Sequence, residues 1–224
     1  MDGNGRWAQK RGLPRAEGHH EGGKTVEQIA IDCTDLGIEY LTLYSFSTEN
    51  WKRPKAEVDA LMHLYTEYLI GIRPMMMKRQ VRLLHLGRKD NLPEKLLKEL
   101  ANSIEMTAQN NGMRLGFALN YSGRTEITNA MQKIASECAQ GKLNVADIDE
   151  KCINQHLYTA GMPDPDLLIR TANEMRVSNF LLWQISYSEF YVTETLWPDF
   201  KRVDLEKAIL AYAGRSRRFG TINK

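Results

Sequence analysis

The sequence predicts an α/β fold: a single domain over residues 1–224 in which a central, mostly parallel sheet of about six strands is flanked by helices. Two observations predict it. Short apolar runs rich in β-branched and aromatic residues alternate with longer segments of helical periodicity, which is the pattern of βαβ units. The run 38–46 carries no charge after Glu39, as expected of a strand that is buried on both faces.

The individual elements follow from local patterns. Apolar residues recur at helical spacing over 23–36, and Gly37 follows as a C-terminal stop. Pro54 opens a long helix with a broad apolar stripe, which should kink near Pro74. The same reasoning predicts further strands at 81–86, 113–121, 167–170 and 190–193, and further helices at 93–110, 125–140, 149–158, 179–187 and 201–214.

The composition indicates a soluble protein of a reducing compartment such as the cytoplasm. Hydrophobic residues make up 42% and charged residues 26%, and the mean hydropathy is -0.46. No apolar run approaches the ~20 residues needed to cross a bilayer, and no signal peptide is visible. The three cysteines are widely spaced without a CxxC pair, which favours buried free thiols. A net charge of +2 gives no indication of nucleic-acid binding.

Nearly every unusual polar cluster lies where a predicted strand ends. Ligands of parallel sheets bind beyond the carboxyl ends of the strands. In chain order, these ends are 2–7, 45–53, 120–124, 170–178 and 194–200. We therefore expect these segments to line one site, and the apolar stripes of the helices to form the core.

The first residues combine groups that hold a diphosphate together with a hard cation. The segment DGNGRW, from Asp2 to Trp7, leaves backbone N–H groups bare at its glycines, offers a carboxylate to the cation and supplies a guanidinium for phosphate oxygens. His19 precedes two glycines at an expected helix start, where backbone donors and an imidazole can bind phosphate. An ordinary helix cap is the alternative for a histidine at this place.

Arginines gather in or beside the same segments, in a number that exceeds what one monoanion requires and suits two diphosphate groups. They are Arg6, Arg15, Arg53, Arg170 and Arg176. For any single one, a solvated loop arginine is the alternative. Asp2 and Glu189 are the carboxylates that we assign to Mg²⁺, which typically takes one or two protein carboxylates with substrate phosphates and waters. For Glu189, a plain surface position is the alternative.

A polar loop at 45–53 precedes the long helix and resembles a lid. It carries the Asn50 amide and the Trp51 indole, and anchoring of the loop on the core is the alternative role for Trp51. The run Met75 to Met77 and the long apolar helix suggest the wall of an apolar tunnel for a flexible hydrocarbon, because thioethers adapt to irregular apolar shapes. Ordinary core is the alternative there.

Together these motifs resemble the signature regions of the cis-prenyltransferases, most closely the bacterial undecaprenyl diphosphate synthases. The resemblance extends from residue 2 to about residue 220 and rests on 2–7, Gly18, His19, Gly22, 47–53, 170–179 and 197–200. It implies a Mg²⁺-dependent homodimeric transferase that condenses farnesyl diphosphate with successive isopentenyl diphosphates in cis. The implied product is undecaprenyl diphosphate, the lipid carrier for peptidoglycan synthesis. A cytoplasmic protein in transient contact with the inner face of the plasma membrane is implied as well.

The resemblance also implies a role for each matching residue. Asp2 becomes the main Mg²⁺ ligand and a catalytic residue, and Glu189 takes the second metal position. The allylic diphosphate would be surrounded by Gly3, Asn4, Gly5, Arg6, Arg15 and His19, with Trp7 flanking it. Isopentenyl diphosphate would be bound by Arg170, Arg176, Val177 and Ser178. A mobile loop would supply Ser47, Thr48, Glu49, Asn50, Trp51 and Arg53, with Asn50 in proton removal, and Arg218 and Gly220 would reach the neighbouring subunit's site.

Three departures from the family pattern stand out. The apolar strand that normally precedes the aspartate motif is expected to be missing from this sequence. Ala172 and Asn173 replace small residues that include glycine, so we expect a stiffer loop there. Met175 stands where some relatives carry a histidine near the metal, which excludes a histidine ligand at that position.

Two functions of other classes remain as alternatives. A phosphatase or nucleotide-handling enzyme would also use Mg²⁺, arginines and glycine loops, but the chain has no GxxxxGK[ST] stretch and no cysteine in a phosphate loop. A non-catalytic subunit that binds polyprenyl lipids is expected to have lost acidic residues at the metal positions, whereas Asp2 and Glu189 are both present.

Overall fold

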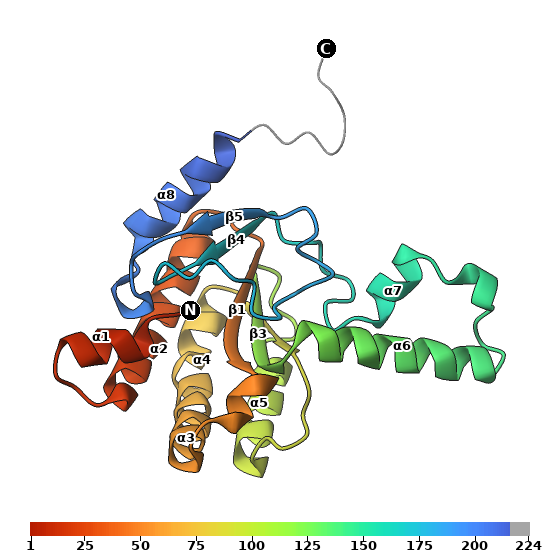
Figure 1. The fold of residues 1–224 in the computed structure, drawn as a ribbon, viewed down its shortest axis with the longest axis horizontal. Coiled ribbons are helices and arrows are strands. Elements are labelled where there is room, and N and C mark those ends of the chain that lie inside the picture. Colours follow the sequence, from red (N-terminus) through yellow and green to blue (C-terminus); the bar gives the residue numbers. More distant parts are fainter. Residues whose placement is uncertain (216–224) are drawn as a thin grey trace.

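The computed structural model, which describes residues 1–215, confirms an α/β fold built on parallel strands. Three strands form one parallel sheet in the order β1 (Tyr40–Ser47), β3 (Arg114–Tyr121), β2 (Arg82–Leu86). Two more, β4 (Leu167–Arg170) and β5 (Glu189–Val192), pair in parallel as a second sheet. In Figure 1, β4 and β5 lie near the top of the view, beside the last helix, α8 (Arg202–Ala213).

The described residues therefore form five strands in two sheets, which differs from the single sheet of about six strands that the sequence predicts. The expected single sheet is interrupted between β1 and β4. β1 and β4 are edge strands of their respective sheets, and no ladder joins them within residues 1–215. Both strands instead line the same cavity, which separates the two sheets.

Helices surround the two sheets, and α8 lies beside β4 and β5 (Figure 1). The helices are α1 (Asn4–Lys10), α2 (Arg15–Asp35), α3 (Lys55–Gly71), α4 (Arg73–Lys78), α5 (Glu94–Met106), α6 (Gly123–Ala139), α7 (Glu150–His156) and α8 (Arg202–Ala213), with short 3-10 helices η1 (Thr48–Lys52), η2 (Val145–Asp147) and η3 (Trp197–Asp199). α6 and α7 extend together to one side of the molecule (Figure 1). None of the helices described within residues 1–215 has the length and apolar character needed to cross a membrane.

Most predicted elements are confirmed to within a few residues, but the N-terminal region is more helical than predicted. The segment predicted as a loop turns into α1 at Asn4, and the following helix begins at Arg15, well before residue 23. The expected kink near Pro74 is a break: α3 ends at Gly71, and Pro74 lies in the first turn of α4, where a missing N–H costs nothing.

The helix predicted over 179–187 does not form. Ser178, Asn179 and Leu181 have φ values of 52°, 61° and 44°, which belong to the left-handed region and end any right-handed helix. The segment is a series of turns instead. Asn179 does cap a helix, but it caps α6, far away in sequence, rather than a helix of its own segment.

A close crossing of α1 and α2 builds the N-terminal side of the fold. A Cβ on Gly18 would lie 2.0 Å from the backbone oxygen of Asn4, and a Cβ on Gly22 would lie 2.3 Å from the Asn4 side-chain oxygen. Only glycine permits this approach. The buried indole of Trp197 donates to the backbone oxygen of Gly22 at 2.9 Å, which fixes η3 on the same helix. The N–H of Trp197 donates to the backbone oxygen of Asp2 at 3.0 Å, so the same tryptophan connects α2 with the Asp2 segment.

Candidate active site

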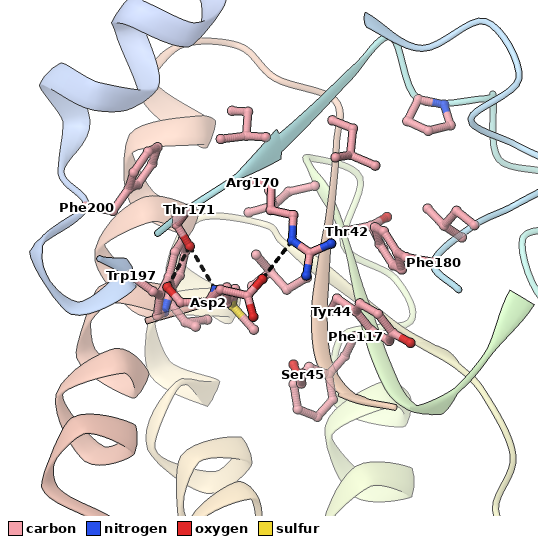
Figure 2. A pocket seen from close by; sticks show the side chains of 18 of the residues that line it. Asp2, Thr42, Tyr44, Ser45, Phe117, Arg170, Thr171, Phe180, Trp197 and Phe200 are labelled. Carbon is pink, nitrogen blue, oxygen red and sulfur yellow. Dashed lines mark hydrogen bonds and ion pairs between the residues drawn. The ribbon is translucent and has the colours of Figure 1, made fainter. Parts of the chain in front are cut away.

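Asp2 lies at the carboxyl end of β4 and is held there by its backbone. Its N–H donates to Thr171 Oγ1 at 2.8 Å, and its backbone oxygen accepts from the Thr171 hydroxyl at 2.8 Å and from the N–H of Trp197 at 3.0 Å. Its side chain faces the cavity, where Arg170 points from β4 toward it (Figure 2), with Nε 2.9 Å from Asp2 Oδ2. The Arg170 side chain is only 11% exposed, so this guanidinium is fixed in place.

The donor set at Asp2 fits a magnesium ion. Within the described part of the chain, Asp2 Oδ1 accepts no hydrogen bond, and the side chain is 39% exposed toward the cavity. Nowhere in residues 1–215 do three or more His, Cys, Asp or Glu side chains gather as a ready-made metal cage. Mg²⁺ characteristically needs no such cage, since one or two carboxylates and substrate phosphates suffice.

The start of α2 gathers two arginines and a histidine whose ring nitrogen has no hydrogen-bond partner. His19 is largely buried, and its Nε2 has no hydrogen-bond partner in the described structure. Arg15 and Arg53 lie beside it and share Glu57, at 3.6 and 3.2 Å. Burial first, and then the positive charge of Arg53, lower the pKa of His19 to about 4. At neutral pH the imidazole is therefore uncharged and can donate one hydrogen bond to an anion between the two guanidiniums.

The lowered pKa predicts that acid destabilises the protein through His19. The unfolded chain takes up a proton near pH 6.5 while the folded imidazole resists protonation down to about 4, so stability is intact above pH 6.5 and falls between these values. The loss should reach about 3 kcal/mol. His19→Gln should flatten this part of a urea-unfolding profile against pH. An unchanged slope in His19→Gln would contradict the assignment.

A residue that the sequence reasoning missed, Glu174, joins two of the predicted arginines. Its carboxylate is paired with Arg6 and with Arg176, and Arg6 also donates to the backbone oxygen of Ala172 at 3.0 Å. One carboxylate therefore gathers guanidiniums from α1 and from the loop after β4. Its place between Arg170 and Arg176 in the sequence is the only signal that could have indicated it.

The loop after β4 is bent by two left-handed residues. Ala172 and Asn173 have φ values of 65° and 56°. Asparagine tolerates this conformation, whereas alanine is strained in it. Backbone hydrogen bonds to Thr195 and Thr193, both 2.8 Å, hold the turn. The bend brings the Arg176 end of the loop to the same cavity as Arg170, as the sequence predicts.

A cavity of about 930 Å³ connects these groups with apolar side chains. This is within the usual size of ligand sites. Its polar end is lined by Asp2, Gly3, Asn4, Gly5, Arg6, Arg15, His19, Ser47, Asn50, Arg53, Arg170, Arg176, Val177 and Ser178. Its apolar lining includes Val26 of α2, Leu61, Leu64 and Tyr65 of α3, and Phe117 of β3, part of which Figure 2 shows. None of Met75 to Met77 lines the cavity. Met75 and Met76 are buried in the core, as the ordinary alternative expects, and Met77 is exposed.

Several predicted residues do not line the cavity. The Trp7 indole donates to Asp199 Oδ1 at 2.8 Å and is covered by Arg11, so its role beside the diphosphate stays a prediction. The Trp51 indole donates to Asn120 Oδ1 at 2.8 Å, which anchors the 45–53 loop on the core. Thr48 and Glu49 belong to η1 and are not among the residues that line the cavity. Arg218 and Gly220 lie outside the described residues.

Glu189 is not brought to Asp2 within this chain. It begins β5 opposite Leu167, while Asp2 contacts Arg170, three residues further along β4, which is roughly 10 Å of strand. Its carboxylate is paired with Arg215 of the segment after α8. The two carboxylates therefore stand at different ends of the small sheet, and a metal role for Glu189 stays a prediction.

Comparisons with known proteins agree with this geometry. A family model described as "Putative undecaprenyl diphosphate synthase" matches residues 1–220. The isoprenyl transferases of Bacillus subtilis and Clostridium perfringens are each 50% identical over 222 residues, which is 99% of this chain and 85% and 88% of theirs.

Solved structures show the same fold. The lavandulyl diphosphate synthase of Lavandula x intermedia, crystallised with dimethylallyl diphosphate, superimposes with a TM-score of 0.96 at 39% identity, over 98% of this chain and 95% of that one. A probable undecaprenyl diphosphate synthase of Campylobacter jejuni gives 0.79 at 33% identity, over 90% and 92%. The chain therefore belongs to the cis-prenyltransferases, the prenyl-transferring enzymes of isoprenoid biosynthesis that include the undecaprenyl diphosphate synthases.

Proposed function

We propose that this prenyltransferase condenses farnesyl diphosphate with successive isopentenyl diphosphates in cis, and that undecaprenyl diphosphate is its product. One observation carries the proposal: two groups of guanidiniums, with Asp2 between them, open onto one cavity that continues into an apolar lining. Two diphosphates and a growing hydrocarbon need that combination. The lavandulyl diphosphate synthase, whose crystal structure is a complex with dimethylallyl diphosphate, supports an allylic diphosphate as one of the substrates.

The allylic diphosphate would lie at the start of α2. Arg15 and Arg53 would grip its oxygens, and the neutral His19 would donate its Nε2–H to one of them. When the allylic carbon–oxygen bond breaks, the electron pair leaves with the diphosphate, and these fixed donors stabilise the charge as it develops. The apolar side chains of α2 and α3 would hold the hydrocarbon away from water.

Isopentenyl diphosphate would lie beside the loop after β4. Arg170, already oriented by Asp2, would bind it together with Arg176 and Ser178. Glu174 now holds Arg176 and also pairs with Arg6 of the allylic diphosphate site. Arg176 would exchange Glu174 for phosphate oxygens of isopentenyl diphosphate, so Glu174 would preorder this guanidinium before the substrate arrives. The double bond of the bound molecule then attacks the allylic carbon.

Asp2 would hold Mg²⁺ with substrate phosphate oxygens. When bound, this cation supplies Lewis-acid stabilisation of the departing diphosphate. The last step removes a proton from the new carbocation. Asn50 lines the cavity, and its Oδ1 accepts from the N–H of Ser47 at 3.1 Å, which fixes the amide. Because an amide is a poor base, Asn50 would position the acceptor, such as a diphosphate oxygen, rather than hold the proton.

The proposal extends to the setting of the reaction. The product would serve as the lipid carrier for peptidoglycan synthesis, made by a cytoplasmic homodimer that meets the inner face of the plasma membrane when it releases its product. Arg218 and Gly220 would complete the neighbouring subunit's site. These statements rest on the family to which the chain belongs.

The test is incubation with farnesyl diphosphate and radiolabelled isopentenyl diphosphate, followed by chromatographic sizing of the lipid. We expect a product of cis-linked units whose formation stops with EDTA and returns with Mg²⁺. A phosphatase would instead release inorganic phosphate without incorporation of label, and a non-catalytic lipid-binding subunit would show neither. Either result would overturn the proposed function. Incorporation that is unaffected by EDTA would overturn the part assigned to Mg²⁺.

A further inference from the structure

Asn179 lies where three segments of the site meet. Its Nδ2 donates to Glu49 Oε1 at 2.7 Å and to Ser122 Oγ at 2.6 Å. Its Oδ1 accepts from the backbone N–H of Arg124 at 2.9 Å, and its backbone oxygen accepts from the N–H of Gly123 at 2.7 Å. Every hydrogen-bonding atom of this amide side chain is thus engaged.

The two sides of the Asn179–Glu49 contact differ in rigidity. Asn179 caps the first turn of α6, and its left-handed backbone, with φ of 61°, is one that asparagine tolerates, so its position is set by the helix. Glu49 is exposed and belongs to the short η1. Burial alone would raise the pKa of Glu49, but hydrogen bonds, first that from Asn179, lower it, so the acceptor at neutral pH is a carboxylate.

The immediate neighbours of this pair line the cavity. Asn50 follows Glu49 and Ser178 precedes Asn179, and both line the cavity, whereas Glu49 and Asn179 themselves do not. The hydrogen bond between Asn179 and Glu49, which lies outside the cavity lining, therefore joins the turn that carries Asn50 to the loop that carries Ser178. Tyr44, whose hydroxyl donates to the Ser178 backbone oxygen at 3.3 Å, supports the same loop from β1.

We propose that the Glu49–Asn179 hydrogen bond is a latch that closes η1 against the isopentenyl diphosphate loop, and that both are positioning residues which set Asn50 opposite Ser178. The inference rests on the proposed function. The bond is charge-assisted but exposed, so its net strength is modest and it can open and close in each cycle. Such reversibility suits an enzyme that must release diphosphate and admit a new isopentenyl diphosphate before every addition.

Three variants separate the latch from a general loss of structure. Glu49→Ala removes the acceptor, and Glu49→Gln retains Oε1 as an acceptor. Asn179→Asp retains the side-chain oxygen that accepts from the N–H of Arg124. It replaces the Nδ2 donor with a carboxylate oxygen, which places a negative charge beside that of Glu49. We expect kcat/KM for isopentenyl diphosphate to fall roughly threefold to tenfold in Glu49→Ala and Asn179→Asp, with the KM for farnesyl diphosphate within about twofold of the parent. Glu49→Gln should stay near the parent, and combining the two damaging changes should add little.

Hydrogen exchange of the peptide spanning 47–53 tests the latch without catalysis. In the ligand-free protein, exchange should be faster in Glu49→Ala than in the parent or Glu49→Gln, and isopentenyl diphosphate alone should slow it only where the latch can form. Parental kinetics and exchange in Glu49→Ala would overturn the latch, as would a loss that Glu49→Gln fails to restore. A parent that exchanges as expected yet condenses nothing would refute the proposed function and leave the latch intact.

Discussion

Replacing Asp2 by alanine is expected to lower kcat/KM for condensation by about a hundredfold to a thousandfold. Groups that stabilise a developing oxyanion in a water-poor site are typically worth that much. Asp2 would act twice, since it holds the cation and also orients the buried Arg170 through a 2.9 Å contact. The backbone hydrogen bonds of residue 2 to Thr171 and Trp197 remain in the variant, so the loop should keep its place.

The matched control is Asp59→Ala, which removes an exposed carboxylate paired with Lys55 on α3. Its activity should stay within about twofold of the parent, because an exposed pair of this kind contributes little. Asp59→Ala should unfold at nearly the parental temperature, and Asp2→Ala somewhat below it, because the largely buried Arg170 loses its partner. An Asp2→Ala enzyme with full elongation activity would contradict the role assigned to the carboxylate.

Gly18→Ala is expected to have the largest effect on stability. Replacing a glycine inside a helix by alanine ordinarily stabilises the protein, because alanine has the higher helix propensity by about 1 kcal/mol. Here the added Cβ would lie 2.0 Å from the backbone oxygen of Asn4, an atom of α1 that cannot swing away as a side chain would. Separating α1 from α2 to relieve this contact should cost about 3 kcal/mol or more, as overpacked cores do.

Gly71→Ala is the control for Gly18→Ala. Gly71 closes α3 with no atom near the position of an added Cβ, so this change should leave the melting temperature equal or raise it slightly. Gly18→Ala should melt roughly 5–10 °C lower and lose activity, because α1 carries Asn4 and Arg6 into the cavity. Equal melting temperatures for the two variants would show that the α1–α2 crossing is not as tight as described.

The parallel α/β frame could be predicted because strand and helix periods alternate clearly along this chain. The polar residues after each strand were also predictable, since carboxyl ends of parallel strands converge, and Asp2, Arg170 and Arg176 do meet at one cavity. The sequence alone could not place Trp7. Its indole donates to Asp199, a residue 192 positions away in the sequence, and no local pattern predicts such a contact.

What the sequence could not predict depends on partners far away along the chain. Phe180, Leu181 and Ile185 are spaced as on a helix, yet Gly123 and Arg124 engage Asn179 and impose turns on the segment. α1 has seven residues, which is too few for apolar residues to repeat visibly at helical spacing. Glu174 pairs with Arg6 across 168 positions, which no local pattern reveals. The sequence also predicts where the strands are but not which strands pair, so the division into two sheets could not be predicted.

The most direct measurement of the Asp2 claim is calorimetric titration with farnesyl thiolodiphosphate, a substrate analogue that ionises very slowly, in the presence and absence of Mg²⁺. In the parent, Mg²⁺ should tighten binding by about tenfold or more, and in Asp2→Ala this gain should vanish while the metal-free affinity set by Arg15, Arg53 and His19 persists. An Asp2→Ala protein that binds the analogue with the full Mg²⁺-dependent gain would contradict the account.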